Sequence, residues 1–321
     1  MRDYIIRRFI LMIPTLFLVT VICFGTVRFI PGSVIDLMVS EMTAEGGATT
    51  VDITEEYVKH RLGLDVPIHV QYGRWVAGVF RGDLGSSMWT NEPVRDELIK
   101  RLPISIELGI FANLLALFLA LPIGIYSAMR QDTLGDYTGR SISILCISLP
   151  SFWLGTMAIV FPSIWWNWSP PIIYIPLTED LMGNLSQFIL PGFILGMVFS
   201  GLIMRMTRTM MLEVLRQDYI RTAWAKGLTE RVVVFRHALK NAMIPVITTA
   251  GTHIAIMIGG SVVLEAIFCL PGVGNYMVQA LRNRDYPVIS GINIVVTGWV
   301  LIMNLLIDLT YGWLDPRVHY K

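Results

Sequence analysis

The stretch FANLLALFLALPIGIY, from Phe111 to Tyr126, decides the fold class because it is apolar on every side. A helix needs roughly 20 apolar residues to cross about 30 Å of hydrocarbon. This stretch extends from Ile104 to Met129 with one charged residue, Glu107. A membrane β-barrel would instead alternate apolar and polar residues over about ten positions. The stretch therefore predicts a membrane-spanning helix.

Five further stretches share this length and apolar character, so we expect an all-α membrane protein with six transmembrane helices. The composition agrees, with 54% hydrophobic and 15% charged residues, against about 25% charged in a soluble domain. The first stretch is longer than the core of a signal peptide and lacks a cleavage site, so we expect it to be retained. The five run from Phe9 to Ile30, Ile142 to Trp166, Phe188 to Met204, Ile244 to Phe268 and Val288 to Trp313.

Basic residues predict the orientation, because Lys and Arg collect in short loops on the cytoplasmic side. With the N-terminus inside, most of them become cytoplasmic, and the largest group lies between Arg205 and Lys240. Most of the others lie in one long segment after the first span, and long translocated segments escape the rule. We therefore expect both termini in the cytoplasm.

Span lengths and loop lengths also predict how the chain is organised. The segment after the first span is too long for a simple connector, so we expect it to hold short helices at the outer face. Its mobile part is expected at Gly46, Gly47, Ala48, Thr49 and Thr50. The expected parts are an N-terminal helix (1–30), an external loop domain (31–102), a core of five helices (103–313) that contains a cytoplasmic loop (206–243), and a cytoplasmic tail (314–321).

The most informative segment is DYIRTAWAKGLTERVVVFRHALKNAMIP, from Asp218 to Pro245. It predicts a short helix that stops at Gly227, because glycine tolerates the left-handed conformation, followed by a second helix. The alternative is an ordinary basic loop, and spacing alone leaves the two open. Thr222 and Ala223 are small, so the short helix could lie close against another protein. Tyr219 and Lys226 lie on roughly the same face of this helix.

This loop resembles that of ATP-binding-cassette importer permeases, which has the pattern E-A-A-x-x-x-G. Arg221, Thr222 and Ala223 fall at the first three positions, and Gly227 falls at the glycine. RTAWAKGL departs from the general pattern at two positions and is similar to the variant in dipeptide and oligopeptide permeases. The resemblance implies a coupling helix seated in a groove of an ATPase subunit, made of Asp218, Tyr219, Arg221, Thr222, Ala223, Lys226, Gly227 and Leu228.

Three more stretches extend the resemblance over essentially the whole chain. SVVLEAIFCLPGVGNYMVQALRNRDYPVI, from Ser261 to Ile289, is similar to the peptide-permease signature between the last two spans. LGLDVPIHVQYGRWVAGVFRGDLGSSM, from Leu62 to Met88, and the two termini resemble the B-type subunit rather than its C-type partner. The resemblance implies the type I importer fold with an extended outer loop between the first two helices.

An outer gate or solute path is expected at seven residues. Glu265 lies near the outer end of the fifth span, where an unpaired buried carboxylate is costly. We expect it to face an aqueous vestibule or a partner, and the alternative is a place at the membrane interface. His253 is an ionisable residue inside a span, and its alternative role is a hydrogen bond to a neighbouring helix. The other five residues lie in a turn and in the polar segment after it, and they are Pro271, Gly272, Gly274, Arg284 and Asp285.

Absent motifs narrow the function further. The sequence contains no G-x-x-x-x-G-K-[ST] loop for nucleotide phosphates, and neither H-E-x-x-H nor G-x-S-x-G. Cys23, Cys146 and Cys269 lack metal-ligand spacing. We therefore expect no catalytic site, no metal site and no cofactor in this chain, with ATP and magnesium bound by partner subunits. A net charge of +1 gives no field that would attract nucleic acid.

The resemblance implies a permease subunit in a prokaryotic inner membrane that carries dipeptides or oligopeptides. Its partners would be a homologous C-type permease, two cytoplasmic ATPases and an external solute-binding protein, with the bilayer around it. Nickel chelates or oligosaccharides are alternative solutes. An ion-driven secondary transporter would usually show an internal repeat and midplane charges, which we do not find. A membrane enzyme would need a nucleophile, a base or metal ligands.

Overall fold

The computed structural model describes residues 2–28 and 65–314, and their regular elements are helices, which confirms the all-α expectation. The described part divides into two compact units. The first contains 101–275 and the end of the last helix from 299, and the second contains 65–100 and 276–298 with most of the first helix. In chain order the helices are α1 (Arg2–Arg28), α4 (Ile68–Phe80), α5 (Val94–Met129), α6 (Leu134–Ser148), α7 (Ser151–Trp166), α8 (Leu181–Leu215), α9 (Asp218–Ala225), α10 (Glu230–Val232), η1 (Val233–Ala238), α11 (Leu239–Gly260), α12 (Val262–Ile267), α13 (Val273–Arg282) and α14 (Tyr286–Leu314).

Four helices in the described part are long and apolar enough to cross a membrane. They are α5, α8, the continuous helix Glu230–Gly260 and the stretch Tyr286–Thr310 of α14. The bent pair of α6 and α7 makes a fifth if it is counted as one span. The apolar part of α1, Met12–Gly25, is shorter. The chain is thus a multi-pass membrane protein, and residues 2–28 and 65–314 contain four or five spans by length and composition.

Two of the expected spans are not single straight helices. The third, expected from Ile142 to Trp166, breaks between α6 and α7 with a bend of 91°. Leu149 at the break is extended, with ψ 124°, because the proline at position 150 disfavours helical backbone in the residue before it. The fifth, expected to reach Phe268, ends at Gly260, and the separate helix α12 follows.

The other expected spans cover only the apolar parts of longer helices. Helix α5 begins at Val94 rather than Ile104, and α8 runs from Leu181 to Leu215 rather than from Phe188 to Met204. The sequence marks the apolar stretch, whereas α5 already begins before it and α8 continues on both sides of it. Helix α4 is a short helix in the long segment after the first span, as expected. The stretch 46–50 lies outside the described residues.

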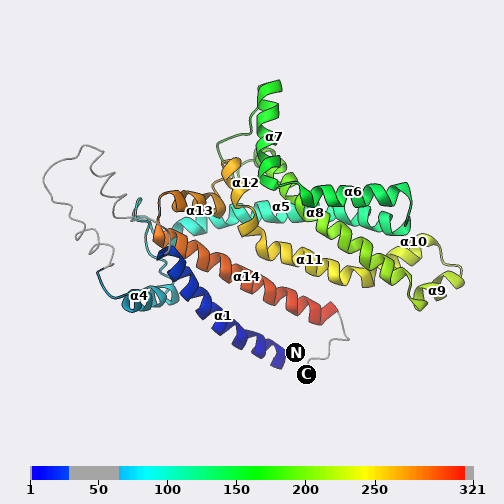
Figure 1. Ribbon diagram of the computed structural model, residues 1–321, viewed down its shortest axis with the longest axis horizontal. Coiled ribbons are helices and arrows are strands. Elements are labelled where there is room, and N and C mark those ends of the chain that lie inside the picture. Colours follow the sequence, from blue (N-terminus) through cyan, green and yellow to red (C-terminus); the bar gives the residue numbers. More distant parts are fainter. Residues whose placement is uncertain (1, 29–64, 315–321) are drawn as a thin grey trace. The chain divides into compact units, whose positions relative to one another are not determined.

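Small residues let the helices of the first unit approach closely. Ala112, Ala116 and Ala120 form a fully buried stripe along α5, at the spacing that keeps one helix face in contact with its neighbours. On α8, a Cβ atom at Gly196 would lie 2.7 Å from the Ala112 carbonyl oxygen, and one at Gly201 would lie 2.8 Å from the Ser143 carbonyl oxygen. Helices α6 and α11 both pack along α8 (Figure 1).

The second unit is held together by aromatic and polar contacts between separate segments. The hydroxyl groups of Thr20 and Tyr72 are 2.8 Å apart, and the Phe24 ring meets Tyr72 edge-on at 5.3 Å between centroids. Elsewhere in this unit, the Trp89 indole N–H donates to the Asn283 carbonyl oxygen at 2.8 Å. These contacts attach α4 to α1 and the 86–93 turn to the segment before α14.

Candidate functional site

The short helix of the basic loop begins and ends where the sequence predicts. Helix α9 starts at Asp218, whose carboxylate suits the positive end of the helix dipole. It ends in a Schellman motif, in which the Gly227 N–H donates to the Trp224 carbonyl at 2.9 Å and the Leu228 N–H donates to Ala223 at 3.4 Å. Gly227 has φ +76°, which confirms its left-handed conformation. The short helix and its glycine stop are therefore present as predicted.

The inner face of α9 is attached to the rest of the first unit. Ile220 and Ala223 are buried in an apolar cluster with Met211 of α8 and with Val233 and Val234 of η1. The expectation that Ala223 contacts another protein is therefore wrong, because its side chain packs inside this chain. Positions three residues apart share a helix face, and that face looks inward.

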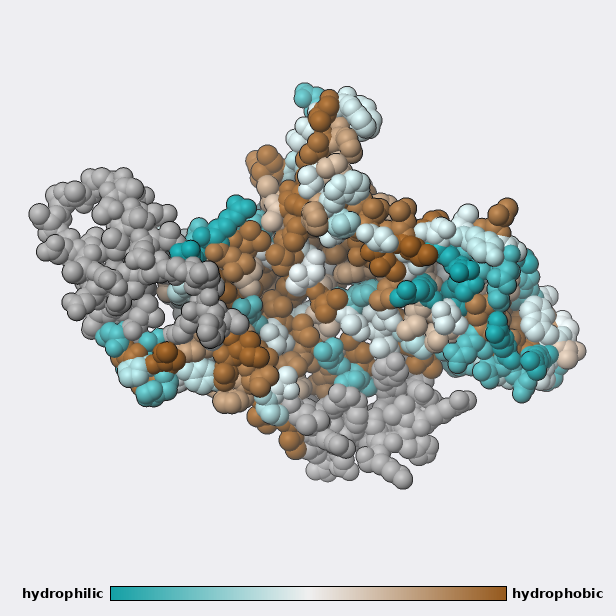
Figure 2. Space-filling view, viewed as in Figure 1, coloured by the Kyte–Doolittle hydropathy of each residue, from teal (hydrophilic) through white to brown (hydrophobic). Residues whose placement is uncertain are grey.

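The outer face of α9 is polar and aromatic. Tyr219, Arg221, Thr222 and Lys226 are exposed, as expected for a contact surface, and Trp224 is 43% exposed beside them. Figure 2 shows hydrophilic residues gathered at the end of the unit that carries α9 and α10. Sequence reasoning missed Trp224, which follows Ile220 by four residues and therefore lies at the edge of the buried face, where it is partly exposed.

Helix η1 gives the loop a second irregular feature. Its π-type hydrogen bonding lies within the otherwise continuous helix Glu230–Gly260, and such segments often occur at functional sites. Val233, Val234 and Ala238 are buried, whereas Phe235 is exposed. The cluster under α9 is thus connected directly to the start of a span.

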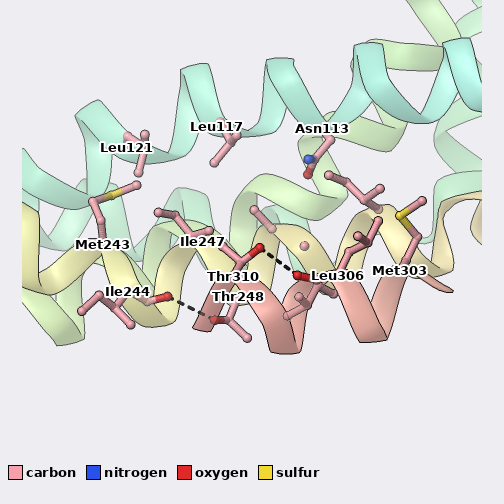
Figure 3. Close-up of a pocket in the computed structure, with 14 residues that line it drawn as sticks. Asn113, Leu117, Leu121, Met243, Ile244, Ile247, Thr248, Met303, Leu306 and Thr310 are labelled. Carbon is pink, nitrogen blue, oxygen red and sulfur yellow. Dashed lines mark hydrogen bonds between the residues drawn. The ribbon is translucent and has the colours of Figure 1, made fainter. Parts of the chain in front are cut away.

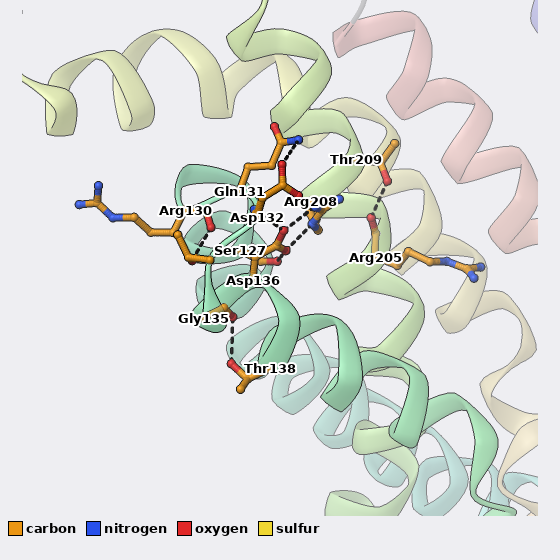
Figure 4. Close-up of polar contacts among 11 residues, drawn as sticks. Ser127, Arg130, Gln131, Asp132, Gly135, Asp136, Thr138, Arg205, Arg208 and Thr209 are labelled. Carbon is orange, nitrogen blue, oxygen red and sulfur yellow. Dashed lines mark hydrogen bonds and ion pairs between the residues drawn. The ribbon is translucent and has the colours of Figure 1, made fainter.

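A buried ion pair fastens the same end of the helices. Asp136 of α6 is fully buried and accepts two hydrogen bonds from Arg208 of α8, from Nε at 2.7 Å and from Nη2 at 2.6 Å (Figure 4). It also accepts from the Ser127 hydroxyl group and from the Asp132 N–H, the latter at 3.1 Å. The sequence interpretation did not include this pair, which joins α5, α6 and α8.

A cavity of about 430 Å³ opens between α5, α11 and α14 in the first unit (Figure 3). Its lining is apolar apart from Asn113, Thr248 and Thr310, and both threonine hydroxyl groups donate to carbonyl oxygens of their own helices. Asn113 points into the space, and its Oδ1 has no hydrogen-bond partner among the described residues. The cavity therefore has apolar walls, and one buried acceptor without a partner in the described part of the chain lies beside it.

Glu265 does not face water, contrary to the expected aqueous vestibule. Its side chain is 0% exposed and accepts from the Ser261 hydroxyl group at 2.6 Å and from the N–H groups of Gly274 and Asn275 at 2.7 and 3.2 Å. These two N–H groups belong to the first turn of α13, where helical N–H groups lack partners within the helix. The buried carboxylate is thus paired inside the chain.

The glycines after this carboxylate are required by close approach. A Cβ atom at Gly272 would clash with the Glu265 carboxylate, and one at Gly274 would lie 2.5 Å from the Val262 Cα atom. Ser105 of α5 accepts the Val273 N–H at 2.9 Å. The predicted turn after Pro271 is therefore the point at which α12, α13 and α5 meet.

His253 lies in α11 and is only 5% exposed. Its ring stacks on Phe199 of α8 with 4.5 Å between centroids, and its Nδ1 has no hydrogen-bond partner among the described residues. The alternative role, a hydrogen bond to a neighbouring helix, is not found at Nδ1. In this structure the ring serves as an aromatic contact between two spans.

Asp285 and Arg284 belong to the second unit. Arg284 has φ +51° at the end of α13. Asp285 follows it, is buried, and accepts from the Ser87 hydroxyl group at 2.5 Å and the Met88 N–H at 3.2 Å. The structure thus brings Glu265, Gly272 and Gly274 together in one unit and places Asp285 against the 86–93 turn in the other.

Two family models match the chain along nearly its whole length. The model described as "Binding-protein-dependent transport system inner membrane component" matches residues 120–320, and the corresponding N-terminal model matches residues 1–109. The chain belongs to this family. It is accordingly a membrane component of a transport system rather than an enzyme.

Full-length relatives of this transport component carry consistent names. The "Dipeptide transport system permease protein DppB" of Escherichia coli strain K12 is 36% identical over 344 aligned residues, with 100% of both chains covered. The protein of the same name in Alkalihalophilus pseudofirmus is 40% identical over 341 residues, again with complete coverage. These identities extend over both units described above.

Solved structures of other transporters share the fold of this membrane component. A chain of the MetNI methionine ABC transporter in an inward facing conformation matches with a TM-score of 0.56 and 16% identity, over 68% of this chain and 96% of that one. A chain of an amino acid ABC transporter matches with a TM-score of 0.51 and 13% identity, over 70% and 94%. At such identities the likeness concerns the fold alone.

Asp285 gives this transport component a pH dependence that can be measured. Burial raises the pKa of Asp285, although hydrogen bonds from Ser87, Met88 and Val288 act against the shift. Its contribution to stability is therefore complete below the unfolded pKa of about 3.9 and is lost as the pH rises through the raised folded pKa. The thermal stability of the wild type should therefore decline between pH 4 and 8 through deprotonation of Asp285. Asp285→Asn should remove this part of the decline.

The measurement is the midpoint of thermal unfolding of the purified chain at each pH. Asp96→Asn, which changes an exposed carboxylate in the same unit, should follow the wild type at every pH. A wild-type protein that becomes more stable between pH 4 and 8, relative to Asp285→Asn, would contradict the prediction.

Proposed function

We propose that this chain forms half of the translocation pathway of an ATP-driven importer for dipeptides or oligopeptides, in the position of the B-type subunit. The full-length likeness to proteins named as dipeptide permeases supports the solute class. The observation that carries the mechanism is the geometry of α9, which is exposed on one face and fastened on the other. Solutes other than peptides remain the alternative.

In the proposed mechanism, α9 transmits movement from an ATPase subunit to the spans. Its exposed side chains, among them Arg221, Trp224 and Lys226, would contact the ATPase. Its inner face packs Ile220 and Ala223 against α8 and η1, so a displacement of α9 would move both of those helices. A well-packed core transmits displacement because it has little free volume.

The topology and assembly are part of the same proposal. The chain would have six spans in a prokaryotic inner membrane, with both termini inside. The described outer parts, α4 and the 86–93 turn, would lie on the outer face. The divisions at residues 30, 102 and 313 are retained as proposed domain limits. The partners would be a homologous C-type permease, two ATPases that bind ATP and magnesium, and an external solute-binding protein.

The cavity beside Asn113 is the proposed solute contact within this chain. Its apolar walls on α5, α11 and α14 suit a hydrophobic peptide side chain, and the free Oδ1 of Asn113 suits a peptide N–H. The expected gate residues then have two kinds of role. The outer end of the pathway would be held in place by Glu265, Pro271, Gly272 and Gly274. Arg284, Asp285 and His253 are retained as proposed gate or solute-path residues.

The test of this function reverses a charge on the outer face of α9. Arg221→Glu should abolish detectable binding of the ATPase subunits, because a carboxylate replaces an exposed cation at the proposed contact. Charge reversal at the rim of an interface mainly slows association, whereas a change at its centre costs several kcal/mol. Trp224→Ala should weaken the same binding through loss of an aromatic contact. The measurements are co-purification of the ATPases and peptide uptake by cells.

Arg74→Glu on α4 is the matched control, since it reverses an exposed charge in the other unit. It should leave co-purification at the wild-type level. If Arg221→Glu and Trp224→Ala both bind the ATPases as the wild type does, α9 is only a basic surface turn and the proposed coupling fails.

A further inference from the structure

Two arginines at the polar end of the first unit line one cavity without an acidic partner among the described residues. The cavity measures about 280 Å³ and lies between α5, α6 and α8. Arg140 of α6 and Arg205 of α8 contribute to its lining, together with Arg208. Arg208 is paired with Asp136, whereas Arg205 is directed away from that carboxylate (Figure 4).

These two arginines, Arg140 and Arg205, lie at the same level of the helix pair, and the Arg140 guanidinium group lies over the Tyr137 ring at 5.6 Å from its centroid. Asp136 is opposite Arg208, and the Ser143 hydroxyl group donates to the Gly201 carbonyl oxygen at 2.7 Å. Higher numbers on α6 thus meet lower numbers on α8, so the helices are antiparallel. In this register Arg140 is opposite Arg205, about one turn beyond the ion pair.

This level is also the boundary of the apolar surface. Arg140 is the last charged residue before the uncharged stretch from Ser141 to Trp166, and Arg205 follows the uncharged stretch from Phe188 to Met204. Exposed apolar side chains follow directly beyond the arginines, with Ile142, Ile144 and Leu145 on α6 and Leu202 on α8, while Leu134 and Tyr137 are exposed on the other side of Arg140. Charge and apolar surface therefore meet at the level where lipid headgroups lie.

We propose that this cavity binds the phosphate group of an anionic phospholipid, with the acyl chains along Ile144 and Leu202. Guanidinium groups match phosphate oxygens in charge and geometry. Basic pockets between membrane helices are a recognised kind of site for lipid headgroups. A free phosphate ion would use the same arginines but would leave the adjoining apolar side chains without a contact. The exposed apolar rim therefore favours the lipid.

The site has a structural consequence for α9. Arg205 lies on the same helix as Arg208 and Met211, and Met211 packs against the inner face of α9. A lipid bound between α6 and α8 would hold these helices together beside the Asp136–Arg208 pair. We infer that an anionic lipid stabilises the end of the transporter that carries the coupling surface.

The experiment measures lipid binding to the purified full-length chain in a zwitterionic detergent by native mass spectrometry. Phosphatidylglycerol and phosphatidylcholine with identical acyl chains are titrated separately, and inorganic phosphate is added as a competitor. Each basic residue near an anionic surface contributes about 1 kcal/mol, which is roughly a fivefold change in affinity. The double variant Arg140→Gln/Arg205→Gln should therefore bind phosphatidylglycerol roughly 30-fold more weakly, with phosphatidylcholine unaffected.

Two further variants separate the site from general electrostatics and from misfolding. Arg216→Gln/Arg231→Gln removes two exposed positive charges from the same end of the unit, outside this cavity, and should retain phosphatidylglycerol binding. Arg140→Lys/Arg205→Lys keeps both charges and should retain most of the affinity. If the glutamine variant does not fold, the lysine variant is compared with another pair of neutral substitutions at the same two positions.

Several results would overturn the proposal. If the glutamine variant binds phosphatidylglycerol as tightly as the wild type, the site is excluded. The site is also excluded if the lysine variant binds this lipid no more tightly than a folded variant with neutral residues at positions 140 and 205. Equal loss in Arg216→Gln/Arg231→Gln assigns the effect to net charge. Complete displacement of lipid by millimolar inorganic phosphate identifies a free anion as the ligand.

Discussion

Replacing Arg208 by methionine should destabilise the chain by about 3 kcal/mol, because it leaves the buried Asp136 carboxylate without its cation. The remaining donors, the Ser127 hydroxyl group and the Asp132 N–H, supply no positive charge. Asp136→Asn should cost less, about 1 kcal/mol, because Arg208 is partly exposed and its guanidinium group can turn towards water. The two halves of one ion pair are thus expected to differ in cost.

The measurement is the free energy of unfolding of the purified chain in detergent for both single variants and the double variant. Removal of both charges should restore part of the loss caused by Arg208→Met, because no unpaired carboxylate then remains. Arg216→Met, at the exposed C-cap position directly after the same helix, is the control and should be nearly neutral. If Arg208→Met is as neutral as this control, the pair does not hold the helices together.

The features that were predictable from the sequence are those set by nearby residues. The stop of α9 follows from Gly227 itself, because this is the position that must be left-handed. The Schellman hydrogen bonds involve only the six residues from Ala223 to Leu228. The spans follow from the length of their apolar stretches. Both kinds of inference use short segments. The structure confirms α9 and finds helices over the apolar stretches, although the third and fifth expected spans are each broken.

The features that were missed depend on residues far apart in the chain. Asp136 and Arg208 are 72 positions apart, and no local pattern indicates that they meet. Ala223 is small and lies in a basic loop, which fits either an outer contact or an inner one. Only the packing of η1 against α9 decides that it is inward. The bend after α6 could have been predicted from Pro150, because proline disfavours helical backbone before it.

Glu265 illustrates why the polarity of a residue does not determine its surroundings. The sequence correctly identifies the cost of an unpaired carboxylate at this depth. That cost is met by backbone N–H groups of the next helix, and not by water. The donors become available because Gly272 and Gly274 let the chain turn closely over the carboxylate. The glycines and the glutamate are therefore one structural unit, which the peptide-permease signature contains together.

The largest effect at this junction is expected from Glu265→Ala, which should reduce the stability of the first unit by about 4 kcal/mol. The Ser261 hydroxyl group and the Gly274 and Asn275 N–H groups would lose their acceptor in a site with no exposure to water. Each buried donor left unpaired costs about 1–3 kcal/mol, and the three losses are not fully additive. Glu265→Gln retains one acceptor oxygen and should cost about half as much.

The experiment compares thermal unfolding in detergent with peptide uptake at a temperature at which each variant remains folded. Glu179→Ala, which removes an exposed carboxylate in the same unit, should behave as the wild type in both assays. If Glu265 acts only by joining α12 to α13, Glu265→Gln should lose stability and retain uptake in the folded fraction. A stable Glu265→Ala protein would contradict the junction. A stable Glu265→Gln protein that cannot transport would instead place the charge of this carboxylate in the transport cycle, because the amide has nearly the same shape and lacks only the charge.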